Sequence, residues 1–269
     1  MWASGSPGST LRAVSRVPGS PASRPRALRV PLEGLEPGPR QLDGATARYV
    51  QRVHRLGPGD RLSFFDPILG VEADAEIVRS GAGSVGCEIA SVHPSGYRAY
   101  PISLLQALAK GSKPDTTIAE ATALGVERIV LLESERAVVR LDEERGAARR
   151  VRWQRIAVEA ARQCGRGKIP VLHGPLALMD VLPQVLEPRR LLLAAGGAPL
   201  LERLRDWQPN QAVALLVGPE GGLSAQEVER ALQLGFLSAS LGPTTLRSEL
   251  AGVAALGALV AFAALRGVG

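Results

Sequence analysis

Cysteine, histidine and aromatic residues are scarce in this chain of 269 residues. The two cysteines, Cys87 and Cys164, lie 77 positions apart, which suits a reducing compartment and not a disulfide-rich secreted fold. No histidine lies near Cys164 in the sequence, which argues against a cysteine nucleophile. The three histidines are scattered and show no metal-ligand spacing, so we expect no metal site.

The chain also lacks a hydrophobic run long enough to span a membrane comfortably. Its longest uncharged apolar stretch, Leu250–Leu265, would be about 24 Å long as a helix, against the roughly 30 Å hydrocarbon core of a bilayer. The stretch is rich in alanine and glycine. We therefore expect a buried helix that allows close packing, including packing against a second subunit, and no membrane partner. A membrane span is the minor alternative.

Acidic residues are absent from the first 30 residues, where five arginines carry most of the net charge of +6. The rest of the chain is nearly neutral, with −2 over residues 31–98 and +3 over residues 99–269. Any nucleic-acid surface on the globular part must therefore be a local patch.

Residues 1–23 consist mainly of Ser, Gly, Pro, Ala and Arg, a composition that predicts a disordered tail. They lack the apolar core of a secretory signal, although an Arg- and Ser-rich, acid-free segment also suits a transit peptide. A start codon assigned too far upstream would also add a segment of this kind. We expect a cytoplasmic protein, with organellar import only if the tail is a transit peptide.

Two short apolar runs near the carboxyl terminus end in the same way, in a Gly-Pro turn that leads into a helix. Ala212–Val217 is followed by Gly218–Gly222, and Phe236–Leu241 is followed by Gly242 and Pro243. Ser224 to Glu227 form a capping box, so a helix should begin at about Ala225. This pattern predicts an α/β sheet whose two loops form one pocket outside the carboxyl ends of the strands.

The first loop favours some ligands over others. Gly221 and Gly222 can adopt positive φ and let a ligand approach bare backbone. A glycine-rich turn before a helix can hold phosphate, but no lysine follows these glycines and Glu220 would repel an anion. The loop therefore suits hydroxyls, an amine or a positively charged ligand. Two ordinary strand–helix turns, or a phosphate-binding α/β protein, are the alternatives.

The stretches Gly218-Pro219-Glu220-Gly221-Gly222-Leu223-Ser224 and Leu241-Gly242-Pro243-X-X-Leu246-Arg247-Ser248-Glu249 resemble the two signature loops of the RsmE family. Members of that family are SPOUT-superfamily methyltransferases that methylate N3 of a uridine in 16S ribosomal RNA. The resemblance covers about Arg26 to Leu265. It implies an α/β fold with a mostly parallel sheet and a C-terminal trefoil knot, preceded by a small β-rich PUA-like domain. It also implies S-adenosylmethionine as the methyl donor and a homodimer with the site near the interface.

The resemblance assigns roles to residues of both loops. Arg247 would stabilise negative charge on the uracil oxygens. Glu249 or Glu220 would accept the N3 proton, although Glu249 could instead anchor a helix start. No metal is needed, because the sulfonium already activates its methyl group. With a third loop after the strand expected at 190–195, the cofactor-binding residues are expected to be Leu193, Gly196, Val217, Gly218, Glu220, Gly221, Gly222, Leu241, Gly242 and Leu246.

Short strands and turns dominate residues 24–98, with strands expected at 27–30, 61–66, 72–78 and 86–92 and a short helix or strand at 45–56. This segment resembles the PUA-like RNA-binding domain of the family, most closely at Tyr49–Asp60, although His54 replaces an apolar residue. Arg48, Arg52 and Arg55 could contact phosphate or form a solvated face. Strand and helix alternate from Ile102, which predicts a mostly parallel sheet, and the resemblance implies that residues 99–269 form the methyltransferase domain.

A basic turn, Lys110-Gly111-Ser112-Lys113, precedes a helix that is predicted to end at Gly125. The turn and helix resemble the lysine-containing loop of the family and the helix that follows it. Glu120 and Ala123 depart from the family pattern, in which lysine and glutamate are expected, so roles on this helix do not transfer. Further helices are expected at 175–186 and 199–207.

Arg145–Lys168 contains eight basic residues and one acid. Trp153, Ile156, Ala160 and Ala161 fall at helical spacing, which leaves arginines on the other faces. A net charge of +7 within 24 residues predicts contact with RNA phosphate, with a solvated face as the alternative. The expected RNA-binding residues are Arg52, Arg55, Lys110, Lys113, Arg152, Arg155, Arg162 and Arg166.

The sequence therefore predicts a methyltransferase that acts on 16S ribosomal RNA or on the small ribosomal subunit. One alternative is a SPOUT enzyme that modifies another RNA base. The other is a non-catalytic RNA-binding protein that has kept the fold.

Overall fold

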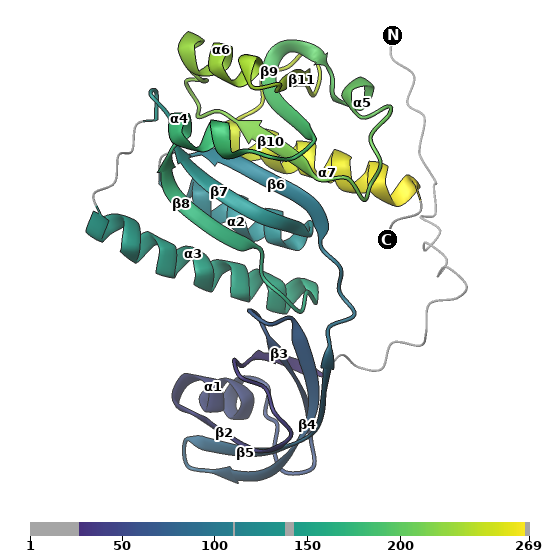
Figure 1. The fold of residues 1–269 in the computed structure, drawn as a ribbon. Coiled ribbons are helices and arrows are strands. Elements are labelled where there is room, and N and C mark those ends of the chain that lie inside the picture. The colour runs from purple at the N-terminus through teal and green to yellow at the C-terminus, as the bar shows by residue number, and fades with distance from the viewer. Residues whose placement is uncertain (1–26, 110, 138–142, 267–269) are drawn as a thin grey trace, which may run out of the picture.

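The computed structural model describes residues 27–109, 111–137 and 143–266. Within these ranges the chain forms a smaller N-terminal β-sheet and a larger C-terminal sheet covered by helices (Figure 1). The predicted tail at residues 1–23 and the predicted RNA contact Lys110 lie outside the described residues.

The N-terminal sheet has the strand order β1-β3-β4-β5-β2, in which β1 runs parallel to β3 and the other pairs are antiparallel. Alternation along β4 buries Ala73, Ala75 and Ile77 and exposes Asp74 and Glu76, as expected for a strand with one wet face. A short helix and a π-helical turn at Tyr49–Val53 complete this core. The elements are β1 (Leu28–Pro31), β2 (Gly38–Asp43), α1 (Gly44–Arg48), β3 (Arg61–Asp66), β4 (Val71–Gly81) and β5 (Ser84–Pro94).

The C-terminal sheet has the order β11-β9-β10-β6-β7-β8, and each neighbouring pair is parallel, so the predicted mostly parallel α/β sheet is confirmed. Every residue of β10 is buried, which is typical of a parallel strand covered on both faces. The strands are β6 (Tyr100–Ala107), β7 (Val126–Glu133), β8 (Val171–Ala177), β9 (Arg189–Pro199), β10 (Val213–Val217) and β11 (Leu237–Ser240).

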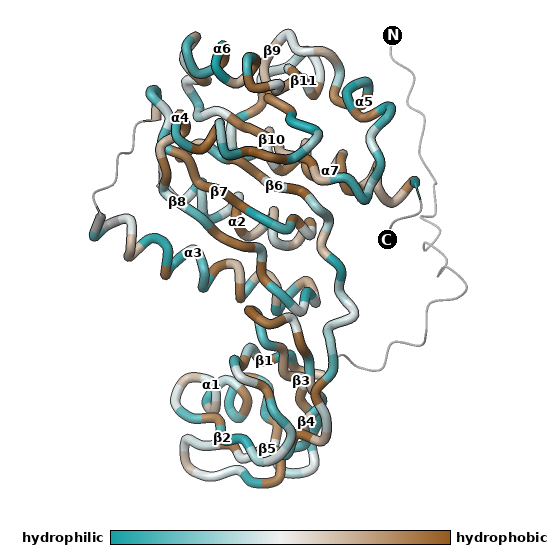
Figure 2. Tube along the Cα trace, in the orientation of Figure 1, coloured by the Kyte–Doolittle hydropathy of each residue, from teal (hydrophilic) through white to brown (hydrophobic). Residues whose placement is uncertain are grey.

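Helices cover both faces of this sheet, and apolar residues are concentrated along its central strands (Figure 2). One face carries α2 (Lys113–Ala123), α3 (Glu143–Cys164), α5 (Leu200–Arg203) and α7 (Ser248–Leu265). The other carries α4 (Leu178–Val181), a 3-10 turn at Leu182–Gln184 and α6 (Ala225–Gln233). Among the described helices, only α7 is long and apolar enough to cross a membrane, and it packs against α2, β6 and β10.

Several elements differ from the expectations, and one of them is the helix expected at 199–207, which is limited to α5 (Leu200–Arg203). The helix expected at 175–186 is shortened, because β8 extends to Ala177 as the edge strand of the sheet. Strand β2 was not expected, because Leu42 is its only buried side chain and gives no apolar alternation. Strand β9 continues through Gly196 and Gly197, where a loop was expected.

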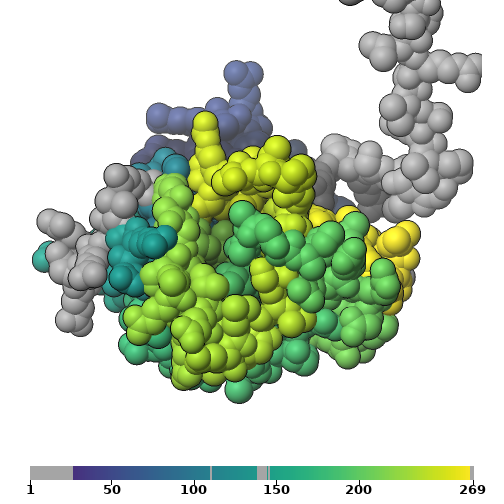
Figure 3. Space-filling view, turned by 90° about the horizontal axis from the view of Figure 1, so that it is seen from above, coloured from purple at the N-terminus to yellow at the C-terminus, as the bar shows by residue number. Residues whose placement is uncertain are grey.

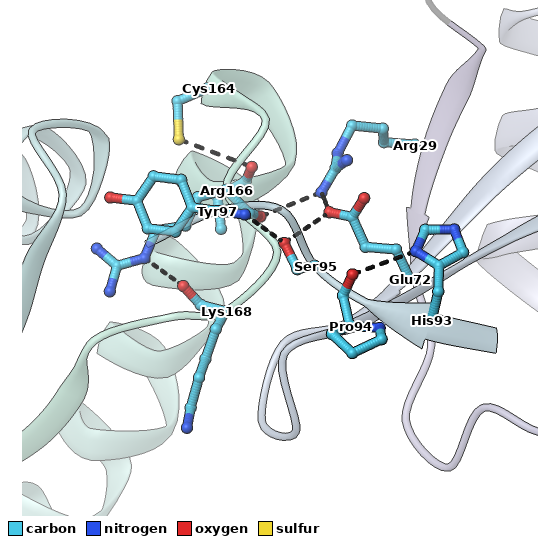
Figure 4. Close-up of polar contacts among 10 residues, drawn as sticks. Arg29, Glu72, His93, Pro94, Ser95, Tyr97, Cys164, Arg166 and Lys168 are labelled. Atoms are coloured by element: carbon cyan, nitrogen blue, oxygen red, sulfur yellow. Dashed lines mark hydrogen bonds and ion pairs between the residues drawn. The ribbon is translucent and has the colours of Figure 1, made fainter. Parts of the chain in front are cut away.

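The two sheets are joined where β1, β4 and the segment after β5 approach the end of α3 (Figure 4). Arg29 Nη2 donates to Glu72 Oε1 at 3.0 Å and to the carbonyl of Arg166 at 3.1 Å. The Ser95 hydroxyl donates to the same Glu72 oxygen at 3.2 Å. A Cβ atom at Gly167 would lie 2.0 Å from Ser95 Oγ and 2.8 Å from Glu72 Oε1. The junction is therefore polar, mostly buried and tightly packed.

Candidate active site

A cavity of about 640 Å³ lies at the carboxyl ends of β9, β10 and β11, where ligands bind in open α/β sheets. Figure 3 looks onto this end of the molecule and shows a depression between the green, lime and yellow segments. Both predicted loops line the cavity, from Gly218 to Leu223 and from Leu241 to Ser248. The expectation that the two loops share one pocket is therefore confirmed.

Nine of the ten residues predicted to bind a cofactor line this cavity: Leu193, Val217, Gly218, Glu220, Gly221, Gly222, Leu241, Gly242 and Leu246. Their contact with a cofactor stays a prediction. Gly196 does not belong to the lining, and its contact with a cofactor also stays a prediction. Residues Leu193 to Gly197 bulge out of register between the pairs Leu192–Ser238 and Ala198–Ala239, and Gly196 lies on the exposed side of that bulge.

In the first loop, positive φ is found at Gly222 but not at Gly221, the other glycine for which it was expected. Gly222 has a φ of +69°, and a Cβ atom at Gly218 would lie 3.1 Å from the backbone nitrogen of Leu223. The capping box at the start of α6 is formed: the Ser224 nitrogen donates to Glu227 Oε2 at 2.8 Å, and the Glu227 nitrogen donates to Ser224 Oγ at 3.2 Å. The loop therefore exposes bare backbone to the cavity and ends at a fixed helix start.

Buried hydrogen bonds connect the second loop to the first. The Ser248 hydroxyl donates to the carbonyl of Gly218 at 2.5 Å and accepts from Gln106 Nε2 at 2.9 Å. Gln106 lies on β6, and a Cβ atom at Gly252 would come within 2.8 Å of its Oε1 atom. The loops are thus parts of one connected structure, which argues against two ordinary, independent turns.

Three charged side chains meet at the mouth of the cavity. Lys113 Nζ lies 2.7 Å from Glu220 Oε1 and 3.4 Å from Glu249 Oε2. The hydrogen bond with Glu220 raises the pKa of Lys113 above its ordinary value despite opposing desolvation, and Glu249 adds to the increase. The sequence predicted Lys113 only as an RNA contact, because no local pattern relates it to residues more than 100 positions away.

Arg247 precedes α7 with extended backbone angles, φ −63° and ψ 147°, and its side chain is exposed at the cavity. This position suits a group that contacts a base entering from solvent. Glu249 follows in the first turn of α7, with its side chain mostly buried and its Oε2 atom without a hydrogen-bond partner among the described residues. Glu220 and Arg247 therefore both line the cavity, and Glu249 is connected to Glu220 through Lys113.

The cavity suits S-adenosylmethionine in shape and chemistry. Bare glycine backbone at Gly218, Gly221 and Gly222 can approach an adenosine closely, and the aliphatic side chains of Leu193, Leu241 and Leu246 can cover the base. The carboxylate of Glu220 suits a cationic ligand. No group of three or more His, Cys, Asp or Glu side chains in the described part of the chain could hold a metal ion.

The predicted RNA-binding residues divide into two sets. Arg52, Arg55 and Arg155 are exposed, and Arg152 is exposed while its Nε atom donates to Asp115 Oδ2 at 2.9 Å. Their RNA contacts stay predictions. Arg166 is only 2% exposed and donates to the carbonyls of Thr122 and Lys168, so the prediction of an RNA contact was wrong for this residue.

Arg162 is also committed to contacts within the protein. It pairs with Glu159, donates from Nη1 to the Tyr49 hydroxyl at 2.5 Å and stacks over the Tyr49 ring. The contact joins α3 to the π-helical turn of the N-terminal sheet. Helical spacing showed that Arg162 lies on the polar side of α3, but it could not show which polar partner is there.

A second hollow, of about 570 Å³, lies between α3 and β8. Its lining is mainly apolar, with Arg150, Lys168 and His173 among its residues. It lies away from the carboxyl ends of β9 and β10, and the described part of the chain places no carboxylate in its lining.

Comparisons with known proteins point to one family. The family model of the RNA methyltransferase domain matches residues 97–260. The Ribosomal RNA small subunit methyltransferase E of Mycobacterium bovis is 31% identical over 229 residues, which cover 81% of this chain and 84% of that protein. The protein of the same name from Bacillus subtilis is 29% identical over 227 residues, covering 81% and 88%. The structure of Ribosomal RNA small subunit methyltransferase E from Neisseria gonorrhoeae bound to S-adenosyl methionine has a TM-score of 0.77 and 28% identity, covering 88% of this chain and 98% of that chain.

Proposed function

Since the chain belongs to the RNA methyltransferase family, we propose that it methylates N3 of a uridine in 16S ribosomal RNA. It is an enzyme of small-subunit ribosomal RNA that uses S-adenosylmethionine. The observation that best supports the proposed reaction is that the two signature loops line one cavity, with Arg247, Glu220 and Glu249 at its mouth.

The chain's own residues have two tasks in this reaction. S-adenosylmethionine, when bound, supplies a methyl group that its sulfonium already activates. The protein has to align N3 of the uracil with that methyl group, and it has to accept the N3 proton. The exposed guanidinium of Arg247 is suited to stabilise the negative charge that deprotonation leaves on O2 and O4 of the base.

Two carboxylates are candidates for the proton acceptor. Lys113 lies near both of them: its Nζ atom donates a hydrogen bond to Glu220 at 2.7 Å and lies 3.4 Å from Oε2 of the mostly buried Glu249, where no hydrogen bond forms. A carboxylate that already accepts a hydrogen bond from an ammonium is a weaker base. We therefore assign the proton acceptor role to Glu249 and a cofactor-facing role to Glu220.

The same proposal divides the chain into functional parts. Residues 24–98 form a PUA-like domain that contacts RNA through Arg52 and Arg55, and residues 99–269 form the SPOUT methyltransferase domain. Exposed arginines on α3, including Arg152 and Arg155, contact RNA phosphate in the methyltransferase domain. Such an enzyme works where ribosomal subunits are assembled, in the cytoplasm.

We also propose the family's trefoil knot and homodimer for this chain. The strand order supports the knot, because β11 follows β10 in the chain but pairs with β9, so that the connection between β10 and β11 has to cross over. The partly exposed apolar face of α7, including Leu250, supports a dimer contact through this helix.

The test is methylation of small ribosomal subunits that lack the modification. Purified chain and S-adenosylmethionine are added, and the ribosomal RNA is digested and analysed by mass spectrometry. N3-methyluridine at a single position supports the proposal. A methyl group on another base would show a different specificity, and donor binding without any methylated nucleotide would show a non-catalytic RNA-binding protein.

A further inference from the structure

An ion-pair cluster connects three separate segments of the chain at the mouth of the cavity. We call Lys113, Glu220 and Glu249 the Lys113 cluster. Lys113 lies in the first turn of α2, Glu220 in the loop after β10, and Glu249 in the first turn of α7. The side chains of Lys113 and Glu220 are 32% and 35% exposed, so a soluble ligand can reach both.

Two carboxylates in this cluster share one ammonium group. Glu220 also lines the cavity, where Arg247 is the other charged residue of the lining within the described ranges. A cationic ligand in the cavity therefore meets a carboxylate that Lys113 already binds. Two cations near one partly buried carboxylate repel each other, so the ligand and Lys113 bind Glu220 in competition.

We propose that Lys113 competes with the sulfonium of S-adenosylmethionine for Glu220, and that Lys113 thereby distinguishes the donor from its spent form. The proposal rests on the proposed function. S-adenosylhomocysteine has lost the sulfonium charge, so in its presence Lys113 keeps its contact with Glu220. When the donor is bound, the Lys113 ammonium leaves Glu220 and becomes available to a phosphate of the RNA.

The raised pKa of Lys113 reflects its hydrogen bond with Glu220, and a lysine that has left this partner is still a cation at neutral pH, because the ordinary pKa of lysine is about 10.4. The exchange also makes donor binding and RNA binding favour each other by the same factor, as linkage requires. After methyl transfer the coupling is lost, which favours release of the product RNA. Lys113 is thus a positioning residue that acts through Glu220 and through the RNA backbone.

Calorimetry with two ligands tests the competition. S-adenosylmethionine and S-adenosylhomocysteine are titrated into the wild type, into Lys113→Met, which removes the charge, and into Lys113→Arg, which keeps it. We expect Lys113→Met to bind S-adenosylmethionine about fivefold more tightly than the wild type does, which is a usual size for coupling between two sites. Its affinity for S-adenosylhomocysteine should change less than twofold. Lys113→Arg should behave like the wild type. Thermal unfolding of each variant establishes that it is folded.

The salt dependence of RNA binding gives a second readout that needs no catalysis. The affinity for 16S ribosomal RNA is measured against salt concentration with each ligand in excess. One added phosphate contact steepens the logarithmic slope by about 0.7 on a single strand. For the wild type, we expect the slope to be steeper by this amount with S-adenosylmethionine than with S-adenosylhomocysteine. For Lys113→Met, we expect the two slopes to be equal.

The outcomes separate the inference from the proposed function. If Lys113→Met lowers the affinity for both ligands equally, Lys113 only stabilises the contact between the segments that carry Glu220 and Glu249. The inference is then overturned, while the methyltransferase function stands. Equal salt slopes for the wild type with the two ligands would also overturn it. If the folded wild type binds no S-adenosylmethionine, the proposed function itself fails.

Discussion

The hydroxyl of Ser248 donates a hydrogen bond of 2.5 Å to the carbonyl of Gly218, and this bond joins the two loops of the active site. Gly218 directly follows β10, and Ser248 begins α7. A change at Ser248, which is buried and lines the cavity, therefore affects both loops at once.

Replacing Ser248 by alanine leaves the Gly218 carbonyl without this buried partner. We expect the free energy of unfolding of Ser248→Ala to fall by about 1–3 kcal/mol, the cost of a buried polar group that loses its hydrogen bond. Urea denaturation measures the change. Ser91→Ala, at an exposed serine of β5, is the control and should change stability by less than about 0.5 kcal/mol. Equal effects of the two substitutions would show that the bond contributes nothing.

Arg247→Ala should remove turnover and leave donor binding nearly intact. Its guanidinium is placed to stabilise charge that exists only during methyl transfer, so kcat should fall about 100- to 1,000-fold. The measurements are single-turnover methylation of small subunits and calorimetry with S-adenosylmethionine. Arg205→Ala, at an exposed arginine after α5, should retain full activity. Undiminished methylation by Arg247→Ala would show that this residue has no part in the reaction.

Gly167→Ala should destabilise the junction between the two sheets. The added methyl group would overlap Ser95 Oγ at 2.0 Å, so the backbone has to shift. Overpacking of this kind costs about 1–3 kcal/mol of unfolding free energy, which urea denaturation measures. Gly96→Ala provides a matched control in the same junction, since a Cβ atom there meets no other atom within 4 Å. If both variants match the wild type, the junction is less tightly packed than described.

The two cysteines should react very differently with a thiol reagent. Burial raises the pKa of Cys87 to about 11, whereas the Cys164 side chain is exposed. The reactive species is the thiolate, so Cys87 stays a neutral thiol below about pH 11 and is also shielded from the reagent. We expect one label per chain at pH 8, lost in Cys164→Ser, and two labels in denaturant. Rapid labelling of Cys87 in the folded protein would contradict its burial.

The chemistry of each loop could be predicted because it depends on residues close together in the sequence. The glycines at 218, 221 and 222 predict a loop whose backbone is not covered by side chains. Ser224 and Glu227 predict the start of a helix, and the structure confirms that start. Parallel strands bring their carboxyl ends to one edge, so a shared pocket also followed from the pattern.

Contacts between distant segments were not predictable in this way. Lys113 and Glu220 are 107 positions apart, and no periodicity relates a basic turn to a loop at that distance. Arg166 belongs to a run of arginines that indicates a solvated or RNA-binding face, yet the turn after α3 directs it inward against Tyr97. Burial of a charged group depends on tertiary packing, which the charge pattern does not contain.

Strands with few apolar residues were the other source of error. β2 keeps a single buried leucine and is held by its backbone pairing with β5, so its sequence resembles a loop. β8 carries Gly174 and Pro175, which favour a turn in sequence-based reasoning. Both strands lie at the edges of their sheets, where one neighbouring strand suffices for pairing.

The polar junction at Arg29, Glu72 and Gly167 bears on which substrates this enzyme accepts. If RNA binds the smaller sheet, as proposed, only nucleotides at one distance from that contact can enter the cavity, because the junction sets the spacing between the sheet and the cavity. Selection then depends on the three-dimensional shape of the ribosomal RNA as much as on its base sequence. Uridines in unstructured RNA, lacking that shape, would be poor acceptors even at high concentration.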